Sequence, residues 1–437
     1  MLYTIITFGC QMNEADSRLM AAVLDGAGWE ETCAPEQADL VVVNTCSVRE
    51  KPEHKVYSLL GEFRELRPLR PGAALVVVGC MAQREGRRML RRAPNVHAVL
   101  GTRCFHHIAD VADRVRAGER PLILTNLDDD PAALRCNLQP ETAPLSAFVP
   151  IILGCTNFCS YCIVPYVRGR ETSRPPAEVV QEVRNLVDGG TREVTLLGQN
   201  VLAYGKDLGE RATFSDLLRE LNEIEGLWRI RFTTCHPRDV DDDLVRAFVE
   251  LPKLCEHLHL PIQAGTDELL LEMHRGYTTA EYVAKVDRLR EAVLDLALTT
   301  DIMVGFPGET DDDFEVSLQL YQRLRLDAAF TFAYSARPGT AAADRPDQVP
   351  KKVKIARLER LIAVQNAITL EKNAAEIGAS AEVLVEGPAP RGEGLLTGKT
   401  RRHKQVVLPG DPGLIGALAQ VRLLEAHLWG FAGTLAE

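Results

Sequence analysis

The sequence predicts an α/β protein in three parts: an N-terminal parallel-sheet α/β domain over residues 1–125, an incomplete (β/α)6 barrel over residues 147–370, and a small β-barrel over residues 371–437. Continuous apolar runs alternate with amphipathic stretches in the first part, which is typical of a parallel sheet covered on both faces. Six strand-and-helix repeats fill the second part, and short strands with glycine turns make up the third. Residues 126–146 are acidic, contain prolines and lack an apolar period, so we expect a linker there.

The composition indicates an intracellular globular protein. Its 437 residues are 46% hydrophobic and 25% charged, which is enough for a large core without disulfide bonds. The cysteine count is odd, at 11, and the N-terminal residues lack the pattern of a secretory signal. No apolar run approaches the ~18 residues of a membrane span, so we expect a cytoplasmic location. Taken alone, the net charge of −11 argues against nucleic acid binding, although a whole-chain sum can hide a local basic face.

Three cysteines of the first part each follow a predicted strand. The apolar runs "LYTIITFG", "ADLVVVNT" and "AALVVVG" lead directly to Cys10, Cys46 and Cys80. Ligands of open α/β sheets sit beyond the carboxyl ends of the strands, so these cysteines are predicted to converge on one site. Burial as small hydrophobic residues is the alternative. That packing role is expected for the cysteines outside any such pattern: Cys33, Cys104, Cys136, Cys235 and Cys255.

A second group of cysteines follows the first strand of the central part. The six strands are predicted in "AFVPIILG", "EVTLLGQN", "RIRFTT", "HLHLPIQ", "ALTTDIMVGFPG" and "AAFTFAYSARPG". Reactive groups of such barrels sit on the loops after the strands. The first loop reads "GCTNFCSYC", which places Cys155, Cys159 and Cys162 in a C-x3-C-x2-C array at the barrel mouth.

Three thiolates, unlike four, leave one corner of a metal site open. Four thiolates saturate a tetrahedral zinc ion or complete the ligation of a [4Fe-4S] cube. With three, the unique iron can take a bidentate ligand, and the α-amino and carboxylate groups of S-adenosylmethionine suit that position. An electron from the cube then cleaves the cofactor to give a radical, while the barrel positions and shields it. A three-cysteine zinc site with a distant fourth ligand and a redox C-x-x-C pair remain alternatives.

Two basic clusters offer a surface for nucleic acid. The small β-barrel carries the first, at Arg391, Lys399, Arg401, Arg402, His403 and Lys404. The second follows Cys80 at helical spacing, and we expect one helix to present Arg84, Arg87, Arg88, Arg91 and Arg92. Such patches suit a phosphate backbone, although a solvated loop face is the plainer interpretation of the first. The segments "HPRDVDDD" and "ETDDD" are interpreted as helix starts and surface charge.

The C-x3-C-x2-C array, with Tyr161 before its last cysteine, resembles the signature of the radical S-adenosylmethionine superfamily. The segments "LLGQN", "HLPIQAG" and "DIMVGFPGE" resemble that superfamily's elements around the cofactor, and the implied cofactor contacts are Tyr161, Gln199, Gln263, Ile302, Gly305 and Glu309. "FGCQMNEADS", "NTCSVREK" and "VVGCMAQRE" resemble the N-terminal domain of methylthiotransferases, and the last block resembles the TRAM module, a small RNA-binding barrel. The resemblance thus spans essentially the whole chain.

The resemblance implies two [4Fe-4S] clusters, an auxiliary one on Cys10, Cys46 and Cys80 and a second on the C-x3-C-x2-C array, together with S-adenosylmethionine. Four segments, among them "YSARPGT", resemble the branch that inserts a methylthio group by radical chemistry at carbon 2 of N(6)-dimethylallyladenosine beside the tRNA anticodon. No catalytic residue is implied beyond the cluster ligands, since an unactivated aromatic C–H has no acidic proton for a general base. The implied RNA contacts are Arg391, Lys399, Arg401, Arg402, Lys404, Arg84 and Arg88.

The implied partners are the tRNA anticodon stem-loop and a reductant such as flavodoxin or ferredoxin, with the protein a monomer. Two related substrates stay open, threonylcarbamoyl-adenosine in tRNA and an aspartate of a ribosomal protein, as does a non-catalytic iron-sulfur RNA-binding protein. The chain departs from the resembled branch at Leu202, where a polar asparagine is usual, and at Cys235, where serine is common. The first departure puts fine substrate contacts in doubt, and neither position is a predicted cluster ligand.

Overall fold

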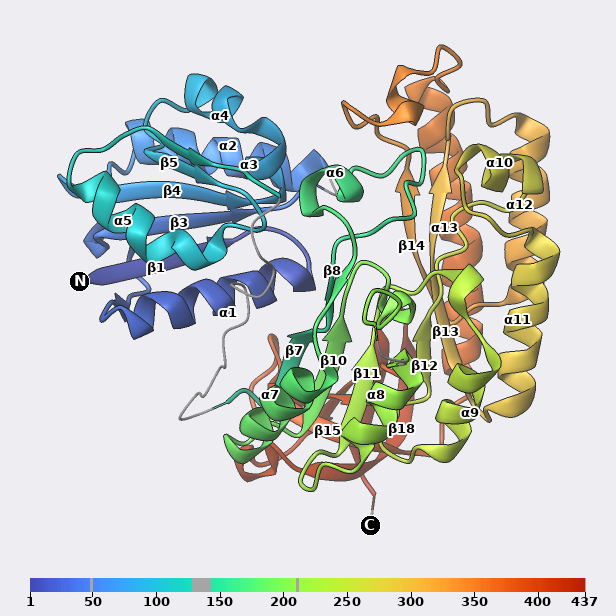
Figure 1. Ribbon diagram of the computed structural model, residues 1–437. Helices are drawn as coiled ribbons and strands as arrows, with labels where there is room; N and C mark the ends of the chain where they lie inside the picture. Colours follow the sequence, from blue (N-terminus) through green and yellow to red (C-terminus); the bar gives the residue numbers. More distant parts are fainter. Residues whose placement is uncertain (48–49, 128–142, 210–211, 437) are drawn as a thin grey trace.

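The computed structural model describes residues 1–47, 50–127, 143–209 and 212–436 (Figure 1). An N-terminal parallel sheet, a central barrel of parallel strands and a C-terminal closed β-barrel follow one another along the chain, which confirms the predicted fold class. Most of the predicted linker, together with Cys136, lies at residues 128–142, outside the described residues. The predicted domain boundaries stay a prediction. No helix of the described part combines the length and apolarity that a membrane crossing requires.

The N-terminal sheet has the strand order β2-β1-β3-β4-β5-β6, with every pair parallel. Its strands are β1 (Leu2–Thr7), β2 (Glu30–Glu31), β3 (Leu40–Thr45), β4 (Ala74–Gly79), β5 (Ala98–Leu100) and β6 (Leu122–Leu124). One face is covered by α1 (Gln11–Gly26) and α5 (Ile108–Arg116), and the other by α2 (Glu50–Glu65), α3 (Cys80–Glu85) and α4 (Arg87–Arg92). Both faces are therefore buried, as the unbroken apolar runs of β3 and β4 require.

The prediction of a single helix after Cys80 is wrong, because two short helices, α3 and α4, lie there. Gly86 adopts a φ of 48°, which ends α3 and starts α4 in a new direction. An L-residue disfavours this left-handed backbone, whereas glycine accepts it at little cost. As a result, Arg84 lies on α3 and the other four arginines lie on α4.

Within the described residues, the central barrel has six parallel strands, as predicted. They form two three-stranded sheets, β11-β10-β7 and β12-β13-β14, and Ile230 of β11 makes an isolated parallel bridge with Leu254, which precedes β12. The strands are β7 (Ser146–Pro150), β10 (Glu193–Leu197), β11 (Arg229–Phe232), β12 (His257–His259), β13 (Ala297–Val304) and β14 (Ala328–Ala333). The helices outside them are α7 (Pro176–Asp188), α8 (Phe214–Asn222), α9 (Asp242–Glu250), α10 (Asp267–Glu272), α11 (Thr279–Ala292) and α12 (Asp311–Leu324).

The acidic segments before α9 and α12 act as helix starts, as predicted. The Asp241 side chain accepts a hydrogen bond from the backbone N–H of Leu244, and Thr310 and Asp313 form a reciprocal capping box. The surface-charge part of that prediction is wrong for His236 and Asp239, which precede α9, because His236 is only 4% exposed and the Asp239 side chain only 6%. His236 does start a short helical turn, since its ring accepts a hydrogen bond from the Arg238 N–H.

A short antiparallel pair, β8 (Ile152–Leu153) and β9 (Thr172–Ser173), brackets the cysteine loop and the helix α6 (Val164–Arg168) that follows it. The long helix α13 (Lys351–Ala374), which was not among the predicted elements, packs against β14 and α12. It leads into the small barrel, whose strands close in the order β15-β16-β17-β19-β18 around a core that includes Val385 and Phe431. These strands are β15 (Ser380–Pro388), β16 (Leu395–Thr400), β17 (Gln405–Pro409), β18 (Leu418–His427) and β19 (Gly430–Leu435). Figure 1 shows this barrel, in red, below the central one.

Candidate active site

A cavity of about 680 Å³ is lined by all six cysteines of the two predicted groups. Cys10, Cys46 and Cys80 follow β1, β3 and β4, which are neighbours in the N-terminal sheet, so their equivalent ends lie side by side. Cys155, Cys159 and Cys162 come from the loop after β8. Helix α1 packs against the central barrel through Met12 and Leu197, and this contact brings the two groups to one chamber.

Two asparagines that the sequence analysis missed organise the first cysteine group. Asn13 is fully buried; its amide nitrogen donates to Asn44 Oδ1 (3.0 Å) and to the Thr45 carbonyl (3.2 Å), which joins α1 to the end of β3. Its Oδ1 accepts a hydrogen bond from the Cys10 backbone N–H (3.3 Å) and lies 3.4 Å from Cys10 Sγ. A Cβ at Gly79, which has a φ of 94°, would lie 2.5 Å from the Thr45 carbonyl oxygen, so only glycine fits directly before Cys80.

The electrostatics of the first group favour a thiolate at Cys10. A hydrogen bond from Cys46 is the main cause that lowers the pKa of Cys10 to about 6, and the charge of Arg168 lowers it further against the effect of burial. Burial raises the pKa of Cys80, although Arg168 opposes that shift. Thiolates are the form that ligates metals, so this corner of the cavity is prepared for a cationic group.

The second group is held by a tight loop. Gly154, with a φ of 79°, approaches the chain so closely that a Cβ there would lie 2.1 Å from the Arg170 carbonyl oxygen. The Cys155 N–H donates to the Gly169 carbonyl (3.1 Å), and Arg275 Nη1 donates to Cys159 Sγ (3.4 Å). Burial raises the pKa of Cys155 to about 11 and that of Cys162 to about 12.

The residues fit iron-sulfur clusters. Buried thiols with raised pKa values release their protons when a metal supplies positive charge nearby. Among the described residues, no three His, Cys, Asp or Glu side chains are placed so that they could hold one metal ion. A [4Fe-4S] cube binds each thiolate at a different iron, so it does not require three ligands around one point. Two groups of three cysteines and a chamber of about 680 Å³ are compatible with that larger group.

The predicted cofactor contacts divide into two sets. Tyr161, Gln199 and Gln263 line the cavity, and Gln199 Oε1 accepts a hydrogen bond from the Gly154 N–H (2.5 Å) at the start of the cysteine loop. The other three, Ile302, Gly305 and Glu309, are not among the lining residues. Ile302 pairs with Gln263 in a parallel bridge, and Glu309 accepts from the Gly305 N–H (2.9 Å) and pairs with Arg357 Nη1 (2.5 Å).

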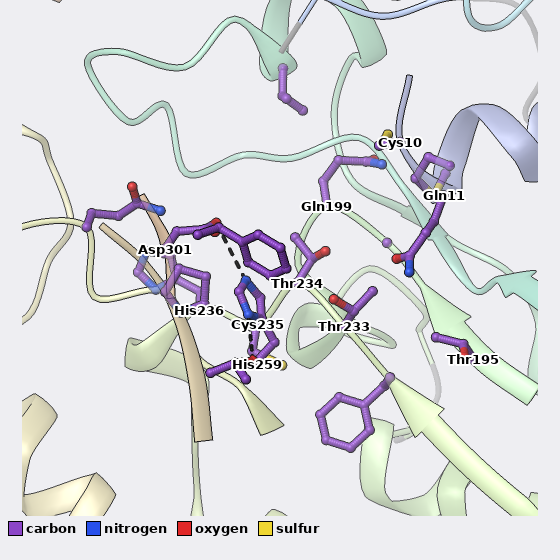
Figure 2. Close-up of a pocket in the computed structure, with 18 of the residues that line it drawn as sticks. Cys10, Gln11, Thr195, Gln199, Thr233, Thr234, Cys235, His236, His259 and Asp301 are labelled. Atoms are coloured by element: carbon purple, nitrogen blue, oxygen red, sulfur yellow. Dashed lines mark hydrogen bonds and ion pairs between the residues drawn. The ribbon is translucent and has the colours of Figure 1, made fainter. Parts of the chain in front are cut away.

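Inward-facing polar residues of the barrel strands also line the cavity, and the sequence analysis missed them. His259 Nε2 lies 3.5 Å from Asp301 Oδ2, and both face the chamber in Figure 2. For His259 the signal was present in "HLHLPIQ", because His257 and His259 are two apart in a strand and share a face. Burial, followed by the charge of Arg275, lowers the pKa of His236 to about 3, so this lining residue is a neutral imidazole.

The basic residues of the small barrel mostly turn inward. Arg401 pairs with Glu256 (2.7 Å), and Arg402 pairs with Glu376 (2.8 Å). Lys404 is buried and donates to Asn373 Oδ1 (2.7 Å). Arg402, His403 and Lys404 line the cavity together with the barrel strands, and the His403 ring stacks on that of His257 at 4.9 Å.

Other predicted RNA contacts vary in exposure. Arg391 and Arg88 are exposed, and Lys399 pairs with Glu386 (3.0 Å). The Arg84 side chain is only 15% exposed and pairs with Glu53 and Glu85, each at 2.8 Å.

The packing role predicted for the remaining cysteines holds only in part. Cys104 and Cys255 are buried, as predicted. Cys33 is exposed, so the prediction is wrong there, since Cys33 follows the exposed edge strand β2 and lies outside the apolar core. Cys235 is buried but also lines the cavity, because it follows β11 at the end that faces the chamber.

Family models match each of the three parts. Residues 149–321 match the radical SAM superfamily, residues 2–101 match the uncharacterized protein family UPF0004, and residues 374–434 match the TRAM domain. A radical S-adenosylmethionine methyltransferase, TsrM from Kitasatospora setae, shares the fold with a TM-score of 0.57 at 13% identity, over 91% of this chain and 77% of that one. The central part is therefore a radical S-adenosylmethionine domain, and membership of that superfamily implies S-adenosylmethionine and a [4Fe-4S] cluster.

Full-length relatives narrow the family. The tRNA-2-methylthio-N(6)-dimethylallyladenosine synthase of Moorella thermoacetica is 46% identical over 100% of this chain and 98% of its own length. The synthase of the same name from Geobacter metallireducens is 47% identical over 100% of this chain and 98% of its own length. The chain belongs to this family of radical S-adenosylmethionine methylthiotransferases.

Proposed function

We propose that this chain adds a methylthio group to carbon 2 of N(6)-dimethylallyladenosine beside the anticodon of tRNA. The observation that carries the proposal is the meeting of six cysteines, from two separate sheets, in one cavity. The names of the full-length relatives support the choice of substrate. A chamber that holds both cysteine groups lets a single bound base lie within reach of both.

We assign one [4Fe-4S] cluster to Cys10, Cys46 and Cys80, and the other to Cys155, Cys159 and Cys162. When bound, the clusters and S-adenosylmethionine supply the electron transfer and radical chemistry that an unactivated aromatic C–H requires. The protein contributes orientation and exclusion of water. Tyr161, Gln199 and Gln263 line the chamber beside the second group and are our proposed contacts for S-adenosylmethionine.

The lining polar groups suit recognition rather than proton transfer. Neutral His236 and the His259–Asp301 pair offer hydrogen bonds to the edges of a base that has left its stack. Because His236 is only 4% exposed and its pKa is low, its ring stays uncharged at neutral pH. It therefore offers the base a neutral hydrogen-bonding group and no positive charge that would attract the tRNA phosphates.

For the tRNA backbone we propose contacts with the exposed basic residues. Arg88 on α4 and Arg391 in the small barrel are exposed and suited to phosphate. Arg84, Arg401, Arg402 and Lys404 would first have to leave their present partners, so they are the weaker candidates. The reductant, such as flavodoxin or ferredoxin, and the monomeric state stay predictions.

Substitution of single cysteines tests the proposal in anaerobically reconstituted, reduced protein. Cys10→Ala should still cleave S-adenosylmethionine to 5′-deoxyadenosine but should lose methylthiolation of tRNA, whereas Cys159→Ala should lose both. Cys33→Ala, an exposed cysteine that does not line the cavity, is the matched control and should retain both. Methylthiolation by Cys10→Ala at the rate of the unmodified protein would contradict the assignment, and absence of cleavage by the unmodified protein would favour a non-catalytic role.

The substrate is tested separately by mass spectrometry of tRNA nucleosides from cells that lack the gene. The proposal requires loss of the methylthio group from N(6)-dimethylallyladenosine. Loss from threonylcarbamoyl-adenosine instead, or an unchanged nucleoside profile, would refute the proposed substrate while leaving the cysteine assignments standing.

A further inference from the structure

Helix α6 lies between the N-terminal sheet domain and the central barrel (Figure 1). It begins two residues after Cys162, and it packs against α3, whose first residue is Cys80. Ile163, Val167 and Cys80 form a small buried apolar cluster at this contact. A residue on α6 can therefore act on the first group although it belongs to the segment of the second.

Arg168, the last residue of α6, makes that connection with its side chain. Its Nε donates to Cys80 Sγ at 3.3 Å, and its Nη2 pairs with Asp16 Oδ2 at 2.7 Å. The side chains of Arg168 and Asp16 are only 5% and 7% exposed, so solvent screens this pair weakly. An arginine stays charged in proteins, and a buried charge of this kind is retained only with a partner.

The N-terminal part also clamps the backbone of α6. Thr102 Oγ1 donates to the Val167 carbonyl (2.5 Å), and Arg103 Nε donates to the Arg168 carbonyl (3.1 Å). These bonds hold the backbone from which the Arg168 side chain reaches the sulfur of Cys80. The second group has a comparable donor, since Arg275 reaches Cys159 Sγ at 3.4 Å, but Arg275 lies in the same barrel as its sulfur.

We propose that Arg168 is a positioning residue that sets the reduction potential of the cluster held by Cys10, Cys46 and Cys80, and that Asp16 limits its effect. The inference rests on the proposed function, which places a cluster there. One-electron reduction adds a negative charge to a cluster, and the potential responds to net charge and to hydrogen bonds at the sulfurs. A guanidinium at hydrogen-bond distance from a ligand sulfur therefore favours the reduced form. The carboxylate of Asp16, which pairs with the same guanidinium, opposes it.

The test isolates this cluster by replacing Cys155, Cys159 and Cys162 with alanine in the full chain. Reconstituted protein is titrated anaerobically with dithionite, and the reduced cluster is followed by electron paramagnetic resonance. Arg168→Gln should lower the midpoint potential by at least about 59 mV, which for one electron corresponds to a tenfold change in the equilibrium constant of reduction. Asp16→Asn should raise it, because the arginine then acts unopposed. Arg168→Lys keeps the charge and should shift it less than Arg168→Gln.

Arg170→Gln is the matched control, since this exposed arginine lies two residues further along the chain. The midpoint potential of the cluster in the Arg170→Gln variant should equal that in the triple-alanine parent. Opposite shifts for the arginine and aspartate variants would not arise from a merely structural role. Equal potentials for Arg168→Gln and the parent, with iron content retained, would overturn the inference alone. Failure of the triple-alanine parent to bind any cluster would overturn the proposed cysteine assignment as well.

Arg168→Gln leaves the buried Asp16 without its partner, which can destabilise the protein. The double variant Asp16→Asn/Arg168→Gln removes both charges and avoids that cost. It should lower the potential less than Arg168→Gln does, because the opposing charge of Asp16 is lost as well, and it should still lower it, because the arginine donates directly to Cys80 Sγ whereas the aspartate pairs with the arginine. If Arg168→Gln alone does not fold, an unchanged potential in the double variant overturns the inference.

Discussion

Replacing Arg229 with methionine should loosen the small barrel from the central one. Arg229 lies at the start of β11 and is fully buried. Its guanidinium crosses to the small barrel, where Nη1 donates to the Lys399 carbonyl (2.7 Å) and Nη2 donates to the Glu382 carbonyl (3.1 Å) and to Glu382 Oε1 (2.9 Å). Methionine fills similar space but makes none of these bonds.

The expected cost follows from those three bonds. Hydrogen bonds that involve a charged group contribute about 1.5–3 kcal/mol each, and two of them serve backbone carbonyls of β15 and β16. The third is made to the Glu382 carboxylate, which is 34% exposed. Because solvent screens this ion pair, it contributes only about 0–1 kcal/mol. After the apolar burial of methionine is counted, docking of the small barrel should weaken by about 3–5 kcal/mol.

Hydrogen exchange in the full-length protein measures this change locally. Since 1.4 kcal/mol corresponds to about tenfold, the protection of amides in β15 and β16 should fall by at least about 100-fold through partial opening. Amides of β4, in the N-terminal sheet, should keep their protection against exchange. The control Arg246→Met removes an exposed arginine of α9 and should change neither. Unchanged protection of β15 and β16 in Arg229→Met would refute the view that this arginine holds the two barrels together.

Two further variants test the chamber. Burial and Arg275 lower the pKa of His236 from 6.5 to about 3, so the unfolded state binds more protons between those values and stability falls as pH drops from 6.5 toward 3, by up to about 1.4 kcal/mol per pH unit. His236→Gln should flatten this slope in urea titrations at several pH values, and an unaltered slope would contradict the assignment. Gly154→Ala should displace the cysteine loop, because its Cβ would meet the Arg170 carbonyl oxygen at 2.1 Å. Iron content after reconstitution should fall, and full occupancy would show that the loop adapts.

The cysteines of the N-terminal sheet were predictable because two simple rules act together. Long apolar runs identify buried parallel strands, and the carboxyl ends of such strands meet at one edge. Cys10, Cys46 and Cys80 follow three neighbouring strands, so position along the chain was enough to bring them together. The six barrel strands were predictable for the same reason.

Elements with polar buried faces were missed. Helix α13 buries Arg357, Gln365, Thr369 and Asn373 beside Leu361 and Ile368, so its buried face does not stand out by hydrophobicity. For the basic residues of the small barrel, the sequence predicted exposure, but most of these side chains have partners inside the protein. A cluster of positive charge in the sequence does not reveal carboxylates that arrive from elsewhere, such as Glu256 for Arg401.

Residue spacing alone identifies two groups of three thiols and the strands that carry them, since periodicity and cysteine intervals are local properties of the chain. Only folding decides that both groups face one chamber, because that depends on α1 docking against a barrel whose residues lie far along the sequence. Folding also places Arg168 beside Cys80, 88 positions away, and turns Arg401 toward Glu256 of the central barrel and Lys404 toward Asn373 of α13. Charge and burial at these points come from neighbours in space, and those neighbours exist only once the three parts have packed together.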